Sequence, residues 1–230
     1  MKLEKRTESL RLPRERWYDD ACGTAMALEL VGERWSLLIV RELMFGPRRF
    51  NELKNGLPGI SANVLTQRLE GMEASGILTR RKLPPPASIQ VYELTRLGYA
   101  AETVVKELGR WAAQSPLHDP TLPLSAASIM LSFRTMLNAK RAEGIDAQIG
   151  FRFGEEEFRA RLAHGEIPIR RGEAAGAELV FTTMPTVLAA AVYGGVPLAE
   201  LEKAGVLSIE GNRSLAERFV TLFPLPPKLI

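Results

Sequence analysis

Residues 56–75 read GLPGISANVLTQRLEGMEAS, and this stretch decides the fold of the first half of the chain. The Leu-Pro-Gly sequence at 57–59 breaks the preceding pattern, and the Ser61 hydroxyl can cap the helix that follows. At helical spacing one face carries apolar side chains and the opposite face polar ones: Leu65, Leu69 and Met72 against Asn63, Gln67 and Glu70. The sequence therefore predicts a helix over 61–75 with one face buried and the other free.

The free face of this helix has the chemistry of a base-reading surface. Asn63 and Gln67 side chains can pair bidentately with an adenine edge in the DNA major groove, and Thr66 can contact a phosphate or a thymine methyl group. A polar helix face is more often only a solvated surface. The interpretation therefore depends on the flanking segments.

The segments before this helix complete a known arrangement. Helical spacing predicts helices over 22–30 and 35–44, the second ending at Gly46-Pro47, and a short helix over 50–54. A helix-turn-helix has this order of elements: a helix, a short helix, a three-residue turn and a further helix. Arg48 and Arg49 stand where the short helix begins, a natural position for phosphate contacts.

The segments after it predict a basic β-hairpin. Residues 77–83 and 89–94 alternate as two strands around a proline-rich tip at 84–88. The three cations beside the tip suit a wing that lies along a phosphate backbone or reaches a minor groove, although alternation turns the middle one away from its neighbours: Arg80, Arg81 and Lys82. A basic surface hairpin without a partner is the alternative. The next predicted helix, 96–111, has an apolar face that either packs on a partner subunit or closes its own domain.

These features define a predicted DNA-contacting set. Arg68 lies near the edge of the buried stripe, so it is expected to contact a phosphate or to form an internal ion pair, and Glu70 would repel phosphate and marks where contact ends. The set is Arg48, Arg49, Ser61, Asn63, Thr66, Gln67, Arg68, Arg80, Arg81 and Lys82.

Residues 20–113 resemble the HxlR-type winged helix-turn-helix transcriptional regulators. The matching segments are Cys22, ALELVGERWSLLI at 27–39, GPRRFNEL at 46–53, LPGIS at 57–61, VLTQRL at 64–69 and LTRLG at 94–98. The resemblance implies a homodimer that binds an inverted repeat in double-stranded DNA, with the terminal helices of the domain at the dimer contact. Gly23 departs from the pattern, because the family usually has proline there.

Cys22, the single cysteine, has two interpretations. A small apolar residue on a helix is more often buried and inert. The resemblance instead implies a thiol sensor at this position, and a helix N-terminus favours thiolate chemistry by lowering the thiol pKa. One cysteine excludes an internal disulfide, and His118 and His164 have no ligand-like neighbours, so we expect neither a metal site nor a cofactor.

The second half predicts an α+β domain, an antiparallel sheet covered by helices. Apolar alternation gives four strands, at 147–153, 158–162, 167–169 and 177–181, and a fifth at 206–209. Helices are expected over 124–142, 185–193, 197–203 and 212–223.

Residues 145–224 resemble sterol-carrier-protein-like domains. The matching segments are MPTVLA at 184–189, GG at 194–195, LEKAG at 201–205, IEGN at 209–212 and LAERF at 215–219. The resemblance implies a cavity between sheet and helices for an apolar or lipid-like ligand. A helix as apolar as 187–192 must be covered on nearly all sides, either by ordinary core or by a ligand. The candidate lining residues are Phe151, Phe153, Phe181, Val187, Leu188, Ala191 and Val192.

Composition sets the limits of these interpretations. The chain has 230 residues, of which 46% are hydrophobic, enough to bury a sizeable core. No segment suits a membrane span and the charged N-terminus has no signal-peptide core, so a cytoplasmic location is expected. The net charge is +3, and residues 1–115 hold 18 Lys and Arg against 14 Asp and Glu. The predicted organisation is a basic arm (1–19), a winged helix-turn-helix domain (20–114), a linker with a connecting helix (115–144) and a ligand-binding domain (145–230).

The sequence thus favours a dimeric, sequence-specific transcriptional regulator that responds to an apolar effector. An enzyme is disfavoured, because no nucleophile–base arrangement, P-loop or GxGxxG motif is present. Two alternatives remain: a lipid-binding or carrier protein dimerised through a winged helix, and a thiol-redox-sensing regulator that uses Cys22. Sequence-specific, salt-dependent DNA binding separates the regulators from the carrier.

Overall fold

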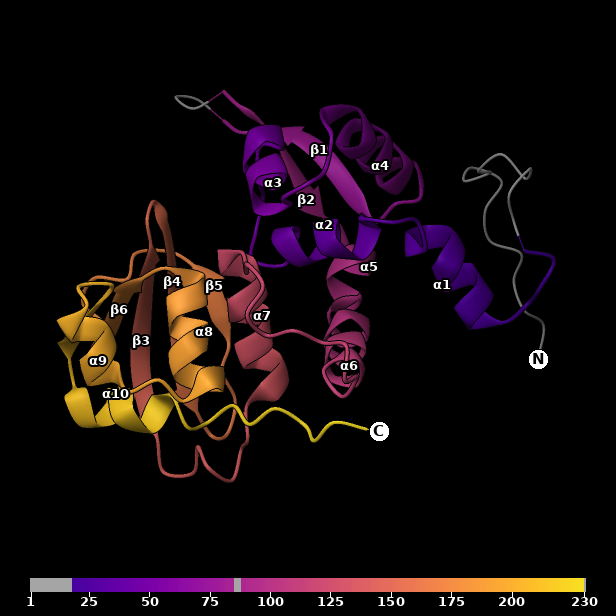
Figure 1. Ribbon diagram of the computed structural model, residues 1–230. Coiled ribbons are helices and arrows are strands. Elements are labelled where there is room, and N and C mark those ends of the chain that lie inside the picture. Colours follow the sequence, from indigo (N-terminus) through magenta and orange to yellow (C-terminus); the bar gives the residue numbers. More distant parts are fainter. Residues whose placement is uncertain (1–17, 85–87, 230) are drawn as a thin grey trace. The chain divides into compact units, whose positions relative to one another are not determined.

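The computed structural model describes residues 18–84 and 88–229, which divide into two compact units with the boundary between Ala101 and Glu102 (Figure 1). The cations of the predicted basic arm, Arg6, Arg11, Arg14 and Arg16, and most of the predicted wing tip lie outside the described residues. Each unit is described by itself below.

The first unit is a winged helix-turn-helix, as predicted. Its helices are α1 (Gly23–Val31), α2 (Ser36–Leu43), α3 (Phe50–Gly56), α4 (Ala62–Ala74) and α5 (Arg96–Ala100), and its strands are β1 (Leu78–Lys82) and β2 (Gln90–Leu94). The two strands pair antiparallel, with Arg80 opposite Tyr92. The backbone of Arg48 extends this hairpin, because it exchanges hydrogen bonds of 2.8 and 2.9 Å with Tyr92.

Local chemistry sets the ends of α4. The Ser61 hydroxyl accepts a hydrogen bond from the Val64 N–H at 3.2 Å and so caps the helix start. Gly76 follows the helix with a positive φ of 74°, a conformation that glycine adopts without strain. The apolar face predicted from the spacing is fully covered: Leu65, Leu69 and Met72 are buried.

The helix predicted over 96–111 is two helices. Thr95 caps α5 through its hydroxyl, which accepts the Gly98 N–H, and α5 ends at Ala100 with Ala101 as its C-cap. The following helix, α6 (Glu102–Ala112), belongs with the second unit, whereas the sequence had placed it in the first domain. An ion pair with Arg134 at 3.0 Å fixes Glu102, the first residue of α6, within that unit.

The second unit contains a five-stranded sheet in the order β5-β4-β3-β6-β7. Its other elements are α7 (Ala126–Met136), β3 (Asp146–Phe153), β4 (Glu156–Ala163), β5 (Ile169–Arg171), β6 (Leu179–Thr183), α8 (Pro185–Gly194), α9 (Leu198–Lys203), β7 (Leu207–Gly211) and α10 (Arg213–Phe219). α7 and α10 are shorter than predicted. α7 ends where Leu137 turns to extended backbone.

The sheet is mixed, and the prediction of a wholly antiparallel sheet was wrong. β3 and β6 are parallel, with Phe151 opposite Phe181. The reason lies in the connection from β5 to β6, since the chain crosses the sheet from the β5 edge before it forms β6. It passes so close to β3 that a Cβ on Gly150 would lie 2.5 Å from the Ala174 carbonyl oxygen. Apolar alternation reports which face a residue occupies and carries no information on strand direction.

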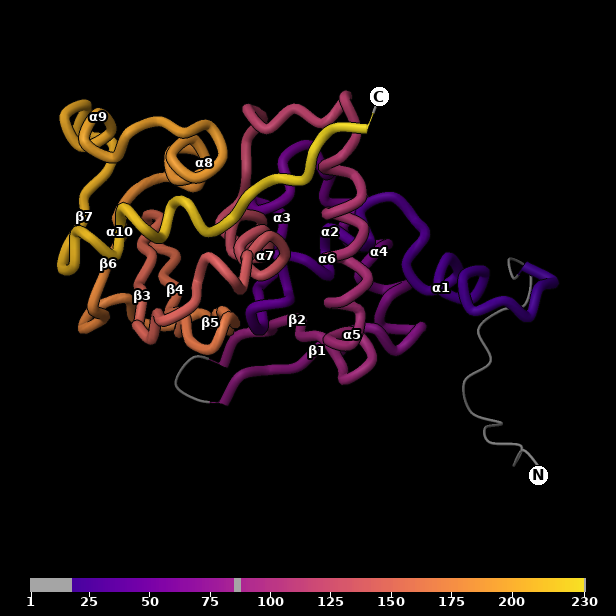
Figure 2. The backbone as a smooth tube through the Cα atoms, turned by 90° about the horizontal axis from the view of Figure 1, so that it is seen from below, coloured from indigo at the N-terminus to yellow at the C-terminus, as the bar shows by residue number. Residues whose placement is uncertain are grey.

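Helices cover one face of this sheet, as the two views show (Figure 2). Phe133 of α7 is fully buried at the centre of the core, with ring centroids 4.5 Å from Phe223, 5.3 Å from Phe219 and 5.9 Å from Phe151. The opposite face is the more polar one, because Gln148, Arg152, Arg159 and Arg161 alternate outward along β3 and β4.

Candidate nucleic-acid interface

The surface of α4 carries the predicted base-reading residues. Asn63, Thr66 and Gln67 are exposed, and they stand on a helix whose other face is buried. Three- and four-residue spacing places such side chains on neighbouring turns of one helix face. The structure therefore brings these three together on a rigid support, as a base-reading helix requires.

The arginines at the start of α3 behave differently from each other. Arg49 is exposed, and its guanidinium holds Glu52 at 2.7 Å while its backbone N–H donates to the same carboxylate. The Arg48 side chain is only 11% exposed, with Nη1 4.0 Å from Glu52. Partial burial acts to raise the pKa of Glu52, but the hydrogen bonds from Arg49 and both cations lower it. Arg49 thus reaches the surface, whereas Arg48 points largely inward.

Arg68 forms an internal ion pair, one of its two predicted roles. Its Nη2 lies 2.8 Å from the Glu33 carboxylate, and its Nε donates to the Arg34 carbonyl at 3.1 Å. These contacts tie α4 to the turn before α2.

The cations of the wing are also paired, with one exception. Arg80 lies 3.2 Å from Glu73 and over the Tyr92 ring at 5.5 Å from its centroid. Arg81 pairs with Glu93, and the hydrogen bond that Arg81 donates to that carboxylate raises the pKa of Arg81. Lys82 is exposed and forms no ion pair within residues 18–84 and 88–229. The opposite directions of Arg80 and Arg81 follow the alternation predicted for the strand.

Acidic partners are the part of this surface that sequence reasoning missed. Glu52 follows Arg49 at helical spacing, so that pair was open to prediction from the sequence. Arg81 and Glu93 face each other only in the register of the hairpin. Glu33 and Glu73 approach their arginines only in the folded unit, and no local pattern indicates those pairs.

Cys22 is exposed at the N-cap of α1, so the interpretation as a buried, inert residue was wrong. The Thr24 backbone N–H and hydroxyl and the Ala25 N–H, at the start of α1, lower the pKa of its thiol. A low thiol pKa at an accessible site favours reactivity, because the thiolate is the nucleophile.

We expect Cys22 to be alkylated by iodoacetamide faster at neutral pH in the folded protein than in urea, because a lowered pKa increases the thiolate fraction. The measurement is the alkylation rate against pH by mass spectrometry, with a lower midpoint in the native state. The isosteric variant Thr24→Val removes one donor and should move the native midpoint upward. Identical midpoints in native and denatured protein would contradict the prediction.

Two other findings concern metal sites and membrane-spanning helices. No group of three or more His, Cys, Asp or Glu side chains that could hold a metal ion occurs in the described part of the chain. None of its helices is both long enough and apolar enough to cross a bilayer.

Five of the seven candidate ligand-lining residues of the second unit lie in its core, and three of these are in ring contact. Phe151, Phe153, Phe181, Leu188 and Ala191 are buried. Val187 and Val192 are partly exposed. The Phe151 and Phe181 rings stack at 5.9 Å, and Phe219 of α10 lies 5.5 Å from Phe181. Aromatic rings therefore occupy much of the space beneath the helices.

The fold and the exposed face of α4 define the first unit as a winged helix-turn-helix of the DNA-binding type. The family model for the HxlR-like helix-turn-helix matches residues 30–118. The HTH-type transcriptional regulator YodB of Bacillus subtilis is 40% identical over 88 residues, which are 38% of this chain and 79% of YodB. This chain therefore belongs to the HxlR family of transcriptional regulators.

Two further comparisons match a similar share of this chain. The uncharacterized HTH-type transcriptional regulator YvaP, also from Bacillus subtilis, is 36% identical over 89 residues, covering 38% of this chain and 82% of YvaP. The structure of reduced YodB is 37% identical, with a TM-score of 0.39, and covers 43% of this chain and 98% of that chain. The family model for the alkyl sulfatase C-terminal domain matches residues 121–228, within the second unit. The resemblance of that unit to sterol-carrier-protein-like domains stays a prediction.

Proposed function

We propose that the protein is a dimeric, sequence-specific DNA-binding regulator whose second unit binds a small-molecule effector. The observation that carries the DNA-binding part is the exposed face of α4, where Asn63, Thr66 and Gln67 stand on a helix anchored by buried residues. In this proposal α4 lies in the major groove and these side chains contact base edges.

Phosphate contacts are assigned to the cations around α4 and the wing. Lys82 is available without rearrangement, whereas Arg49, Arg80 and Arg81 are held by carboxylates. Exposed ion pairs of this kind contribute only about 0–1 kcal/mol each, so a phosphate can replace the carboxylate at small cost. Arg48 and Arg68 are better placed to hold the fold than to contact DNA directly.

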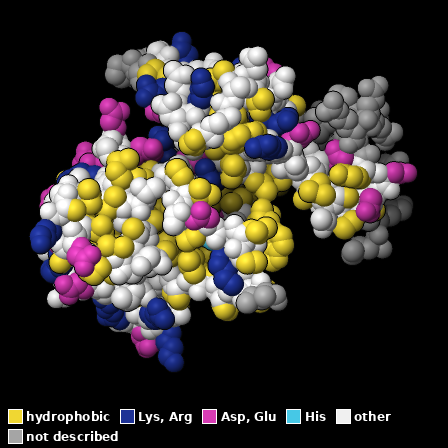
Figure 3. Space-filling model, in the orientation of Figure 1, with side chains coloured by type: hydrophobic (Ala, Val, Ile, Leu, Met, Phe, Trp, Pro, Cys, Tyr) yellow, Lys and Arg dark blue, Asp and Glu magenta, His cyan; other side chains and the backbone are white. Residues whose placement is uncertain are grey.

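Pairing of two copies is proposed through α6. Val104, Leu108 and Trp111 recur at helical spacing, and the Trp111 side chain is 67% exposed. Hydrophobic side chains gather over α6 and, separately, over α1, where Met26 and Leu28 are exposed (Figure 3). An apolar stripe of this kind on a surface helix marks a protein interface. A dimer would place two copies of α4 against two half-sites of an inverted repeat.

The effector is proposed to bind between the sheet and α8, which is almost wholly apolar and lies over the sheet (Figure 1). The proposed lining residues are Phe151, Phe153, Phe181, Val187, Leu188, Ala191 and Val192. Because aromatic rings occupy this space, the ligand would bind by displacing Phe151 and Phe181 from their present packing. Ligand binding changes DNA affinity only if the two conformations bind the ligand with different affinities.

Thiol sensing is a second candidate for the input signal. The exposed position of Cys22 and its lowered pKa favour it. Loss of DNA binding on mild oxidation, absent in Cys22→Ser, is the result this candidate requires.

The test of DNA binding is selection from random double-stranded DNA by the full chain at two salt concentrations, with its molar mass in solution measured in parallel. We expect a dimer and enrichment of one inverted repeat whose half-site centres lie about 34 Å, or a multiple of it, apart. Binding should weaken steeply as salt rises, since phosphate contacts release counterions. Failure to enrich any sequence at either salt would overturn the proposal and favour the carrier protein.

A further inference from the structure

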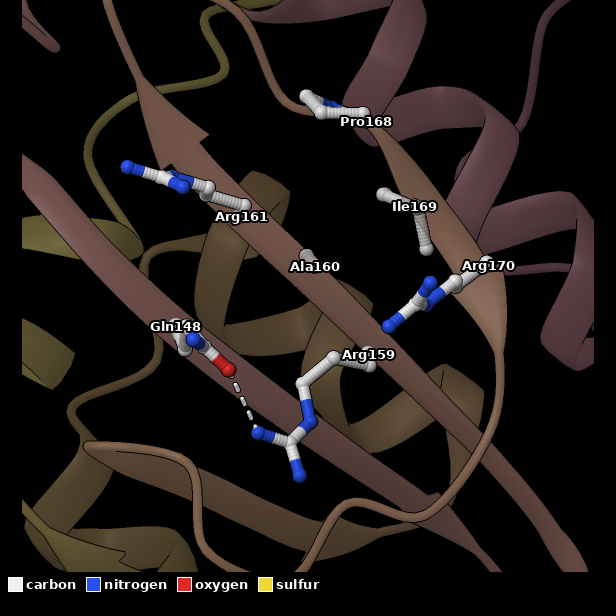
Figure 4. A pocket seen from close by; sticks show the side chains of 7 residues that line it. All are labelled: Gln148, Arg159, Ala160, Arg161, Pro168, Ile169 and Arg170. Atoms are coloured by element: carbon white, nitrogen blue, oxygen red, sulfur yellow. Dashed lines mark hydrogen bonds between the residues drawn. The ribbon is translucent and has the colours of Figure 1, made fainter.

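The open face of the second-unit sheet carries a cluster of arginines. Arg159 and Arg161 lie on β4 and Arg170 on β5, with Gln148 on the neighbouring strand β3 (Figure 4). Together they surround a hollow of about 340 Å³. The β4 backbone at Ala160 forms its floor, since the Ala160 side chain faces the buried core, and Pro168 and Ile169 complete one wall.

The cations of this hollow are poorly neutralised. Arg159 and Arg170 are directly opposite in the strand register, an arrangement that is destabilising for like charges. Among the described residues, Arg159 donates only to neutral oxygens: the Gln148 amide at 2.8 Å, the Glu173 carbonyl at 3.0 Å and the Ala175 carbonyl. Arg170 is exposed and forms no ion pair within the described ranges.

The residues that line the hollow include no carboxylate. Asp146 lies 3.2 Å from Arg161, but both side chains are exposed, so the pair contributes little. Glu178 accepts the backbone N–H of Gln148 at 2.9 Å. Three arginines line the hollow, and Glu157, two residues before Arg159 on β4, is paired with Arg152 at 3.1 Å.

The Arg159 guanidinium is also held in place. The segment that supplies its carbonyl partners is fixed on the sheet, because the Ala174 N–H donates to Glu157 at 2.8 Å and the Glu178 N–H donates to the Gln148 carbonyl at 3.0 Å. A cation held by neutral acceptors keeps its full charge and loses little conformational freedom when a ligand arrives.

We propose that this hollow binds a small molecule through an oxyanion group, a carboxylate, phosphate or sulfate. Arg170 supplies a free guanidinium, Arg159 a fixed one with N–H groups still unused, and Arg161 closes the rim. Guanidinium groups recognise such oxyanions through paired, charge-assisted hydrogen bonds. This site lies on the face opposite the proposed apolar effector site, and it does not depend on DNA binding.

The test is isothermal titration calorimetry of the full chain with inorganic phosphate and, separately, with succinate, at an ionic strength held constant with chloride. Saturable binding of either anion at one site per chain is expected. Loss of a charge-assisted contact in Arg170→Gln should raise the Kd by about tenfold or more. The anion that binds identifies the headgroup as phosphoryl or carboxylate, and either result supports the site.

The matched control is Lys203→Gln, which removes the same charge from an exposed position at the end of α9. Its Kd should stay within about twofold of the parent value, because distant surface charges are screened.

A second readout is the Tm without anion. Arg170→Gln should not lower this Tm, since the substitution removes a repulsive pair. No saturable binding of either anion, or equal weakening by both variants, would overturn the proposal. DNA selection is read separately, so failure of one proposal is distinguishable from failure of the other.

Discussion

Phe133→Ala is expected to lower the free energy of unfolding of the second unit by about 3–5 kcal/mol, the usual cost of deleting a buried aromatic side chain. Phe133 is fully buried and touches rings from three other segments, including Phe223 at a centroid distance of 4.5 Å. Phe151 is anchored on the sheet and Phe219 on α10, so the surrounding groups can collapse only partly into the space left behind.

The measurement is unfolding in urea, monitored by hydrogen exchange at residues of the second unit. This separates the unfolding of the second unit from that of the first. Phe133→Leu keeps most of the volume and should cost much less than the alanine variant. Leu117→Ala, at a side chain that is 91% exposed, should change stability by no more than about 0.5 kcal/mol. A loss near 1 kcal/mol for Phe133→Ala would contradict close packing, and it would favour a core that already has room for the proposed apolar effector.

Sequence patterns were sufficient for the first unit because its signals are local. The cap at Ser61, the apolar stripe on α4 and the alternating strands of the wing each depend on residues a few positions apart. The structure confirms these elements to within a residue or two. The single predicted helix over 96–111 was wrong, because the helix is interrupted at Ala101. The place of α6 in the second unit was missed separately, since its grouping with α7 depends on contacts far along the chain.

In the second unit, sequence patterns predicted the positions of the strands but not their directions. The strands were found at nearly their observed positions, since alternation marks which residues are buried. The parallel pairing of β3 with β6 was missed, because strand direction depends on the route of residues 172–178 across the sheet. Gly150 was the available clue, since glycine within a strand often marks a close backbone approach.

The sequence predicted where the candidate DNA surface lies, but it predicted the charge of that surface only in part. Exposure of Asn63, Thr66 and Gln67 followed from the helical period, which needs no tertiary information. The pairing of Arg68 with Glu33 and of Arg80 with Glu73 arises from folding, and it leaves less unpaired positive charge than the sequence suggested. The proposal of DNA binding therefore rests more on the base-reading residues of α4 than on a broad basic surface.

Gln67→Ala is expected to reduce discrimination between the selected inverted repeat and random DNA by about 1–3 kcal/mol per half-site, the usual worth of a bidentate base contact. The side chain is exposed on α4, and truncation leaves the buried Leu65 and Leu69 untouched, so the fold should be unchanged. The measurement is the ratio of the two Kd values at one salt concentration.

Lys82→Ala provides the contrasting variant, because Lys82 is the wing cation without an ion pair in the described part of the chain. It should weaken binding to both DNAs alike and reduce the slope of log K against log salt by about one unit per lost contact. Phosphate contacts are the same for every sequence, whereas base contacts are not. If Gln67→Ala instead weakened both DNAs equally, the side chain would be positioning the helix rather than reading a base, and the recognition role assigned to α4 would pass to another element.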